Sequence, residues 1–175
     1  MVQIFELLAR KSTSAVLARF LDRPTRETYA AGLIAELDIS RKSVFDALCA
    51  LEKSGMIERR AVGRMNQYRL RRDDSRARQL KTLRTMDMLV PMLEGMRGSG
   101  TEVYLYGSAA RGEDSEGSDI DLLFIGEMPE RSRLAKIEAV ERIKPLYLSF
   151  LEYSSLARKD KPFYERIEKD RIRLV

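Results

Sequence analysis

The chain has 175 residues, with 32 Lys and Arg against 27 Asp and Glu and a formal net charge of +5. It has no His and a single cysteine, Cys49, which excludes a His/Cys zinc site, a Ser-His or Cys-His nucleophile pair and an intramolecular disulfide. No apolar run approaches the ~20 residues that span a bilayer, and the start lacks the basic region of a secretion signal. We therefore expect a soluble, cytoplasmic protein with no membrane partner.

The basic excess lies in the first half of the chain. Residues 1–80 hold 16 basic and 10 acidic residues, whereas residues 81–175 hold 16 and 17. A basic half beside a nearly neutral half favours a polyanion-binding module joined to a second module.

The first predicted elements are helices, because apolar residues recur at helical spacing. This spacing runs over residues 4–21, with a break expected near residues 11–14, and again over about 29–37. A third helix is expected to begin after Ser40, a good N-cap, and to end at Gly55, where a left-handed C-cap residue belongs. Cys49 lies inside this helix and is expected to be a small buried side chain.

The period then changes to that of strands. Residues 56–62 and 65–70 are short extended candidates on either side of a Gly63-Arg64 turn, which predicts a β-hairpin. Three helices followed by a hairpin resemble a winged helix-turn-helix domain, and the resemblance covers about residues 12–70. It implies binding to double-stranded DNA through the third helix and the hairpin.

The candidate DNA contacts are polar or basic residues of these two elements: Arg41, Lys42, Ser43, Arg59, Arg60 and Arg64. Two other interpretations stay open. These charges, together with Arg69, form a solvated basic surface in one of them, and in the other the winged helix contacts a protein.

A connecting helix is predicted over residues 73–97, with an apolar stripe that packs on either domain or on a second copy of the chain. Pro91 should kink or end it. Gly98-Ser99-Gly100 is the clearest boundary, so the expected domains are 1–72 and 98–175, joined by this helix. Strands alternating with helices predict a small mixed-sheet α/β domain after the boundary, and the chain as a whole is expected to be α+β. The strands are expected at 102–106, 118–125 and 146–151, and the helices at 131–143, 152–158 and 163–169.

The most informative pattern is Gly107-Ser108, ten intervening residues, and then Asp119-Ile120-Asp121 on an apolar strand. Alternate strand residues share a face and lie roughly 7 Å apart, so the two carboxylates can converge on one point. Such a pair suits Mg²⁺ or Mn²⁺, which keeps bound waters and shares its coordination shell with substrate phosphates. Gly107 lets a phosphate approach the backbone, and Ser108 offers hydroxyl and N–H donors. The pattern predicts a clamp for a nucleoside triphosphate such as ATP.

This segment strongly resembles the minimal nucleotidyltransferase domain of the DNA polymerase β-like superfamily. The resemblance implies that Gly107 and Ser108 bind the triphosphate, and that Asp119 and Asp121 hold the metals while a nucleoside monophosphate passes to a hydroxyl acceptor. Arg111 and Ser118 match common choices of the family at the nucleotide site. Asp119 and Asp121 are thus the candidate catalytic residues.

One departure leaves the activity open. Members of the family usually have a third carboxylate on the next strand, yet residues 144–151 contain no acid, and Glu152 lies just beyond them. Two functions follow: a DNA-binding protein that binds Mg-NTP and transfers a nucleotide, or a non-enzymatic regulator or antitoxin-like partner protein with a degenerate transferase fold. A second copy of the chain, through the winged helix or the connecting helix, and a helical protein are further candidate partners.

Overall fold

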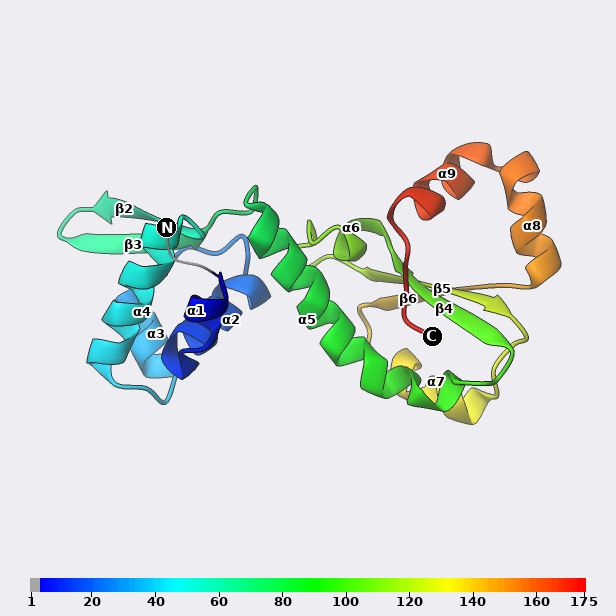
Figure 1. The fold of residues 1–175 in the computed structure, drawn as a ribbon, viewed down its shortest axis with the longest axis horizontal. Helices are drawn as coiled ribbons and strands as arrows, with labels where there is room; N and C mark the ends of the chain where they lie inside the picture. Colours follow the sequence, from blue (N-terminus) through cyan, green and yellow to red (C-terminus); the bar gives the residue numbers. More distant parts are fainter. Residues whose placement is uncertain (1–3) are drawn as a thin grey trace. The chain divides into compact units, whose positions relative to one another are not determined.

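The computed structural model describes residues 4–175, so residues 1–3, part of the start considered for a secretion signal, lie outside it. The chain is mixed α+β and divides into two compact units, Met1–Leu80 and Lys81–Val175, each with a small sheet of its own (Figure 1). Within the described residues, no helix has the length and apolar character needed to cross a membrane.

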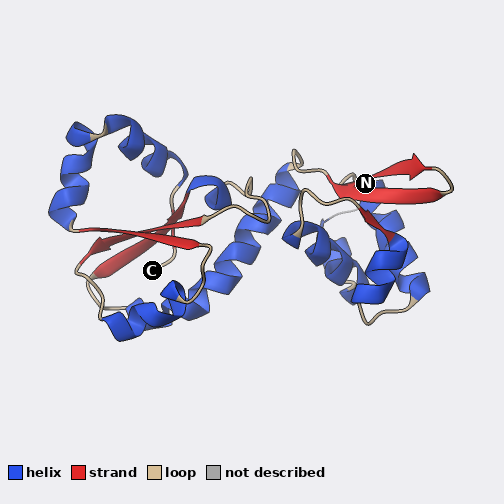
Figure 2. Ribbon diagram, turned by 180° about the vertical axis from the view of Figure 1, so that it is seen from behind, coloured by secondary structure: helices blue, strands red, loops and turns tan. Residues whose placement is uncertain are grey.

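The N-terminal unit has the predicted order of helices followed by a hairpin. The break between its first two helices falls at residues 9–10, just before the expected range 11–14, which forms the start of the second helix instead. A short strand that the sequence pattern did not reveal, β1, pairs with the hairpin, which gives an antiparallel sheet in the order β1-β3-β2 (Figure 2). The elements are α1 (Ile4–Leu8), α2 (Lys11–Asp22), β1 (Thr28–Tyr29), α3 (Ala30–Glu36), α4 (Arg41–Ser54), β2 (Ile57–Val62) and β3 (Met65–Leu70).

Both predicted caps of α4 are confirmed. The Ser43 backbone N–H donates to the Ser40 side chain at 3.1 Å, and Gly55 follows the helix with φ of +80°. The expected burial of Cys49 is wrong, because this side chain is exposed. Leu48 lies in the buried stripe of α4, and the next residue is rotated by about 100° around the helix, away from the core.

Helix α5 (Ser75–Leu93) lies within the range 73–97 predicted for a connecting helix, and the division between the two units falls inside it. Its early residue Ala77 belongs to the core of the N-terminal unit, whereas Leu89 and Leu93 belong to a core of the C-terminal unit. Pro91 lies in the last turn, after which the chain continues as a short 3₁₀ helix, η1 (Glu94–Met96).

The C-terminal unit is built on a four-stranded sheet in the order β6-β5-β4-β7, in which only the β5–β6 pair is parallel. Helices α8 and α9 cover one face, and α7 with the later part of α5 covers the other, as both views show (Figures 1 and 2). The elements are β4 (Thr101–Tyr106), α6 (Gly107–Ala110), β5 (Ile120–Gly126), α7 (Arg131–Glu138), β6 (Ile143–Leu148), α8 (Phe150–Lys159), α9 (Lys161–Asp170) and β7 (Ile172–Arg173).

The third predicted strand of this unit was placed three residues too late. Strand β6 starts at Ile143, in the range assigned to the preceding helix, and Phe150 and Leu151 belong to α8 instead of to the strand. The physical reason is a capping box: the Ser149 side chain accepts from the Glu152 backbone, and the Glu152 side chain accepts from the Ser149 N–H.

Both faces of the C-terminal sheet are buried, so successive side chains along a strand point alternately into two cores. Val103 and Leu105 of β4 pack with α5, α6 and α7, whereas Tyr104 and Tyr106 pack with α8 and α9. The interior of β5, residues 122–125, is buried on both faces in the same way. Because an ionised side chain is costly in such surroundings, charge on β5 is tolerated only near its ends.

A buried ion pair fixes the loop that leads into β5. The Nζ of Lys81, on α5, lies 2.8 Å from Oδ1 of Asp114, and the two side chains are only 6% and 10% exposed. On the next residue of α5, the Thr82 hydroxyl donates to the Ala110 carbonyl at the end of α6, at 3.1 Å. This part of α5 therefore holds both α6 and the loop that follows it.

Substitution Lys81→Met should lower the free energy of unfolding of the C-terminal unit by about 3–5 kcal/mol, because it leaves the Asp114 carboxylate buried without its partner. Urea denaturation followed by circular dichroism measures the change. The control is Lys161→Met, which removes an exposed ion pair with Glu165 and should cost no more than about 1 kcal/mol. Equal losses in the two variants would contradict a structural role for the buried pair.

Candidate functional site

Gly107 approaches Asp121 so closely that a side chain at this position would displace the carboxylate. It follows β4 with φ of +74°, and an added Cβ would lie 2.4 Å from Asp121 Oδ2. The antiparallel register pairs Tyr106, at the end of β4, with Asp121 near the start of β5. Two features therefore favour glycine here: the left-handed backbone and the close contact with Asp121.

The two aspartates lie at the start of β5, in different surroundings. Asp119 precedes the strand and is 56% exposed, whereas Asp121 is half-buried. Burial raises the pKa of the Asp121 carboxyl, the negative charge of Asp119 raises it further, and the Arg166 guanidinium partly offsets both effects. A raised pKa in the folded state means that stability is lost as the pH rises through that pKa, so ionised Asp121 costs stability at neutral pH. A cation bound to both carboxylates would offset this cost.

The two carboxylates suit a metal ion whose coordination shell is completed by phosphate oxygens. Within residues 4–175, no group of three or more His, Cys, Asp or Glu side chains is placed to hold a metal ion. Two carboxylates with open coordination positions fit Mg²⁺, which keeps several waters and is commonly completed by substrate phosphates. They do not fit an ion held by protein ligands alone.

A lysine lies where sequence reasoning sought a third acid. Strand β6 runs parallel to β5, and Lys144 pairs in register with Asp121. Its Nζ is 4.0 Å from Asp119 Oδ1. Glu152 lies beyond the opposite end of β6, where Leu148 pairs with Ile125, and its carboxylate caps α8. The structure thus excludes Glu152 as a substitute and brings a cation to the acid pair.

The other predicted nucleotide-site residues make contacts within the domain. Ser108 is half-buried in the short helix α6. The Arg111 guanidinium lies 2.7 Å from Glu113 and 2.7 Å from Asp170, which ties the end of α6 to α9. The Ser118 hydroxyl accepts from the Ser115 N–H at 2.8 Å. Arg111 and Ser118 therefore shape the loop between α6 and β5.

Arg166 is a site residue that sequence reasoning missed. It lies on α9 and is exposed. Burial raises the pKa of both Asp121 and Tyr106, and the nearby charge of Arg166 offsets part of that rise. Its guanidinium lies 5.0 Å from the centroid of the Phe163 ring, one turn earlier. No signal in the sequence connects α9 to the aspartates, because the connection depends on how α9 packs on the sheet.

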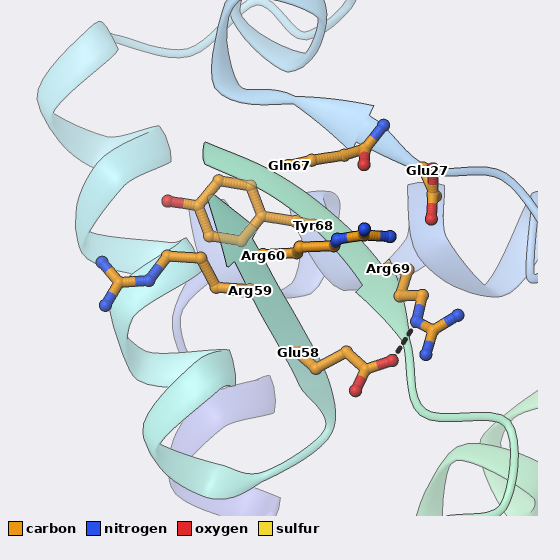
Figure 3. Close-up of a pocket in the computed structure, with 7 residues that line it drawn as sticks. All are labelled: Glu27, Glu58, Arg59, Arg60, Gln67, Tyr68 and Arg69. Atoms are coloured by element: carbon orange, nitrogen blue, oxygen red, sulfur yellow. Dashed lines mark hydrogen bonds and ion pairs between the residues drawn. The ribbon is translucent and has the colours of Figure 1, made fainter. Parts of the chain in front are cut away.

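In the N-terminal unit, the hairpin places Arg59 and Arg60 on opposite faces (Figure 3). Arg59 pairs in register with Tyr68, which is buried, and its Nε lies 3.1 Å from Glu52 of α4. Arg60 pairs with Gln67 on the outer face. A hollow of about 280 Å³ lies here, lined by Glu27, Glu58, Arg59, Arg60, Gln67, Tyr68 and Arg69, in which Arg69 and Glu58 form an ion pair.

The remaining candidate DNA contacts also differ in whether their side chains already make contacts within the unit. The Arg41 guanidinium lies 5.9 Å from the centroid of the Phe45 ring, and Ser43 takes part in the N-cap of α4. Four exposed cations of the candidate set form no ion pair with any described residue: Arg41, Lys42, Arg60 and Arg64. Of these four, Arg41 has the contact with an aromatic ring. Among the described residues, the cations of the set with neither an ion pair nor an aromatic contact are therefore Lys42 of α4 and Arg60 and Arg64 of the hairpin.

Comparison with known proteins supports the interpretation of the C-terminal unit. Residues 92–175 match the family model of the nucleotidyltransferase domain. No curated protein matches the chain. Two solved structures are similar over 55% of this chain and 84% of their own: an ArsR-like transcriptional regulator from Rhodococcus sp. RHA1 (23% identity, TM-score 0.36) and a candidate nucleotidyltransferase from Sulfolobus solfataricus (22%, TM-score 0.33). Both TM-scores are low, and neither structure assigns a function to this chain.

Substitution Gly107→Ala should destabilise the C-terminal unit by more than Gly98→Ala does. Both glycines have φ of +74°, but an added Cβ at Gly98 meets nothing within 4 Å, so this control isolates the backbone cost of about 1–2 kcal/mol. At Gly107 the Cβ also displaces Asp121, which should cost about 1–3 kcal/mol more. Denaturation curves of the two variants give the difference, and equal curves would contradict a close contact with Asp121.

Proposed function

We propose that this chain is a DNA-binding regulator whose C-terminal domain binds a nucleoside triphosphate together with Mg²⁺. The observation that carries the nucleotide part is the approach of Gly107 to Asp121, because it brings a bare backbone segment beside a carboxylate pair. The match of residues 92–175 to the nucleotidyltransferase domain supports the same assignment.

The proposed binding mode uses the groups at the junction of β4, α6 and β5. The backbone at Gly107 and the N–H and hydroxyl of Ser108 donate to phosphate oxygens. Asp119 and Asp121 bind Mg²⁺, which neutralises the carboxylates and the phosphates at once and makes their approach favourable. Arg111 and Ser118 support this arrangement by holding the loop that joins α6 to β5.

Binding without transfer is the better supported activity. Transfer requires a hydroxyl oxygen to attack the α-phosphorus while pyrophosphate leaves, and a third acid would help to bind the catalytic metal or to activate that hydroxyl. Lys144 lies beside Asp119 instead, and an ammonium group neither accepts the proton nor binds a metal. We therefore propose that the nucleotide acts as a ligand of the regulator.

The DNA-binding part rests on the N-terminal unit. Its order of helices and hairpin is that of a winged helix-turn-helix, in which the helix after the turn enters the major groove and the hairpin contacts the backbone. Here α4 would be the recognition helix. Lys42, Arg60 and Arg64 are the proposed phosphate contacts, since their charges are exposed and have neither an ion pair nor, unlike Arg41, an aromatic contact among the described residues.

Nucleotide binding is tested by titrating fluorescent NTP analogues into the full chain with Mg²⁺. Asp121→Ala should weaken binding by at least about tenfold, because it removes a metal ligand, whereas Gly98→Ala should leave it unchanged. With α-³²P-labelled NTPs we expect no label on any acceptor. Wild-type protein that binds no nucleotide would contradict the proposal, and label transfer that depends on Asp121 would show an active transferase.

DNA binding is tested by the salt dependence of affinity for mixed duplex DNA. Each residue that contacts a phosphate contributes about 0.9 to the slope of log K against log salt, so Lys42→Met, Arg60→Met and Arg64→Met should each reduce the slope by about that amount. Arg59→Met is the matched control, because this neighbour is paired with Glu52 on the opposite face. Affinity that does not depend on salt, or equal effects of Arg59→Met and Arg60→Met, would contradict the proposal.

A further inference from the structure

We infer that the candidate nucleotide site accepts a single divalent cation, the one that arrives with the triphosphate, and that Lys144 occupies the place of a second. The inference rests on the proposed nucleotide binding and deepens it. It concerns the number of metal ions that bind. The residues of this chain differ at this point from those of a site that binds two ions.

Lys144 is held at the acid pair by the sheet. Its pairing with Asp121 puts both residues on the face covered by α8 and α9. The Lys144 ammonium lies 3.0 Å from the Glu141 carbonyl, to which it donates, and 4.0 Å from Asp119. The carbonyl contact keeps the charge near the start of β6. A second divalent ion at the aspartates would therefore have to displace a positive charge already in place.

Arg166 supplies a second protein cation from another element. The Arg166 guanidinium, on α9, lies 5.0 Å from the centroid of the Phe163 ring, and that centroid lies 6.4 Å from the centroid of the Tyr106 ring. Tyr106 pairs in register with Asp121, so Arg166 lies on the same side of the sheet as the carboxylates, while Lys144 lies beside Asp119. The two cations partly balance the charge of the two carboxylates before any ligand enters. A free divalent ion then gains little on binding, because much of the attraction of the acid pair is already balanced.

A bound triphosphate reverses this balance. Its phosphates bring several negative charges, which attract Lys144 and Arg166 and leave the carboxylates free for the one ion that the nucleotide carries. Metal and nucleotide should therefore bind together, and the two protein cations should contribute to phosphate affinity. This explains why a lysine is compatible with the site even though it removes a metal ligand.

The experiment is a titration of the full chain with Mn²⁺, followed by electron paramagnetic resonance, with and without a non-hydrolysable NTP analogue. We expect one bound Mn²⁺ per chain with the analogue, and at least about tenfold weaker binding of Mn²⁺ without it. Lys144→Asp should bind a second Mn²⁺ in the presence of the analogue. Lys144→Met should still bind one, with several-fold weaker affinity for the nucleotide. Lys136→Met, which changes an exposed lysine of α7, is the control and should match the wild type.

Two bound Mn²⁺ ions in the wild type would overturn the inference while leaving nucleotide binding intact. A folded Lys144→Asp variant, checked by circular dichroism, that still binds one ion would overturn it as well. If that variant does not fold, the wild-type count and the Lys144→Met affinity decide the question. Absence of any nucleotide binding by the wild type would instead overturn the proposed function, and this inference with it.

Discussion

The close approach of the chain at Gly107 to the Asp121 carboxylate is the constraint on which the C-terminal site depends. Antiparallel pairing of β4 with β5 brings the two residues together, and the absence of a side chain at Gly107 permits the contact. The sheet adds a second requirement, because residues 122–125 are buried on both faces. Carboxylates on β5 are thus confined to the end of the strand, where backbone donors and solvent are both near.

The rest of the C-terminal unit holds this junction in place. Lys81 fixes the loop through Asp114, and Arg111 fixes the end of α6 through Asp170. These ties come from helices on opposite faces of the sheet, α5 and α9, so the loop is held from both sides. Asp119, at the end of this loop, stays exposed. A rigid scaffold around an accessible carboxylate is the arrangement that lets a site bind a ligand without first being ordered.

Local signals predicted much of this structure, and contacts between distant segments account for what they missed. Ser40 and Gly55 marked the ends of α4 because capping depends on a few neighbouring residues. The facing of Lys144 towards Asp119 depends on the register of two parallel strands joined through α7, which no local pattern encodes. The position of Arg166 depends in the same way on the packing of α9. The missed start of β6 hid the relationship between Lys144 and the aspartates.

The charges of the two units suit phosphate ligands by different means. In the N-terminal unit several arginines are neutralised by acids, as Arg59 is by Glu52 and Arg69 by Glu58, which leaves a few exposed cations to attract a polyanion directly. Such attraction weakens with added salt. In the C-terminal unit the acid pair is only partly balanced by Lys144, so under the proposed function a phosphate ligand binds there together with a divalent ion. Affinity there should follow the metal concentration more than the ionic strength. The net charge of +5 therefore does not describe either unit. Under the proposed function, ligand binding depends on salt in the N-terminal unit and on divalent ions in the C-terminal unit.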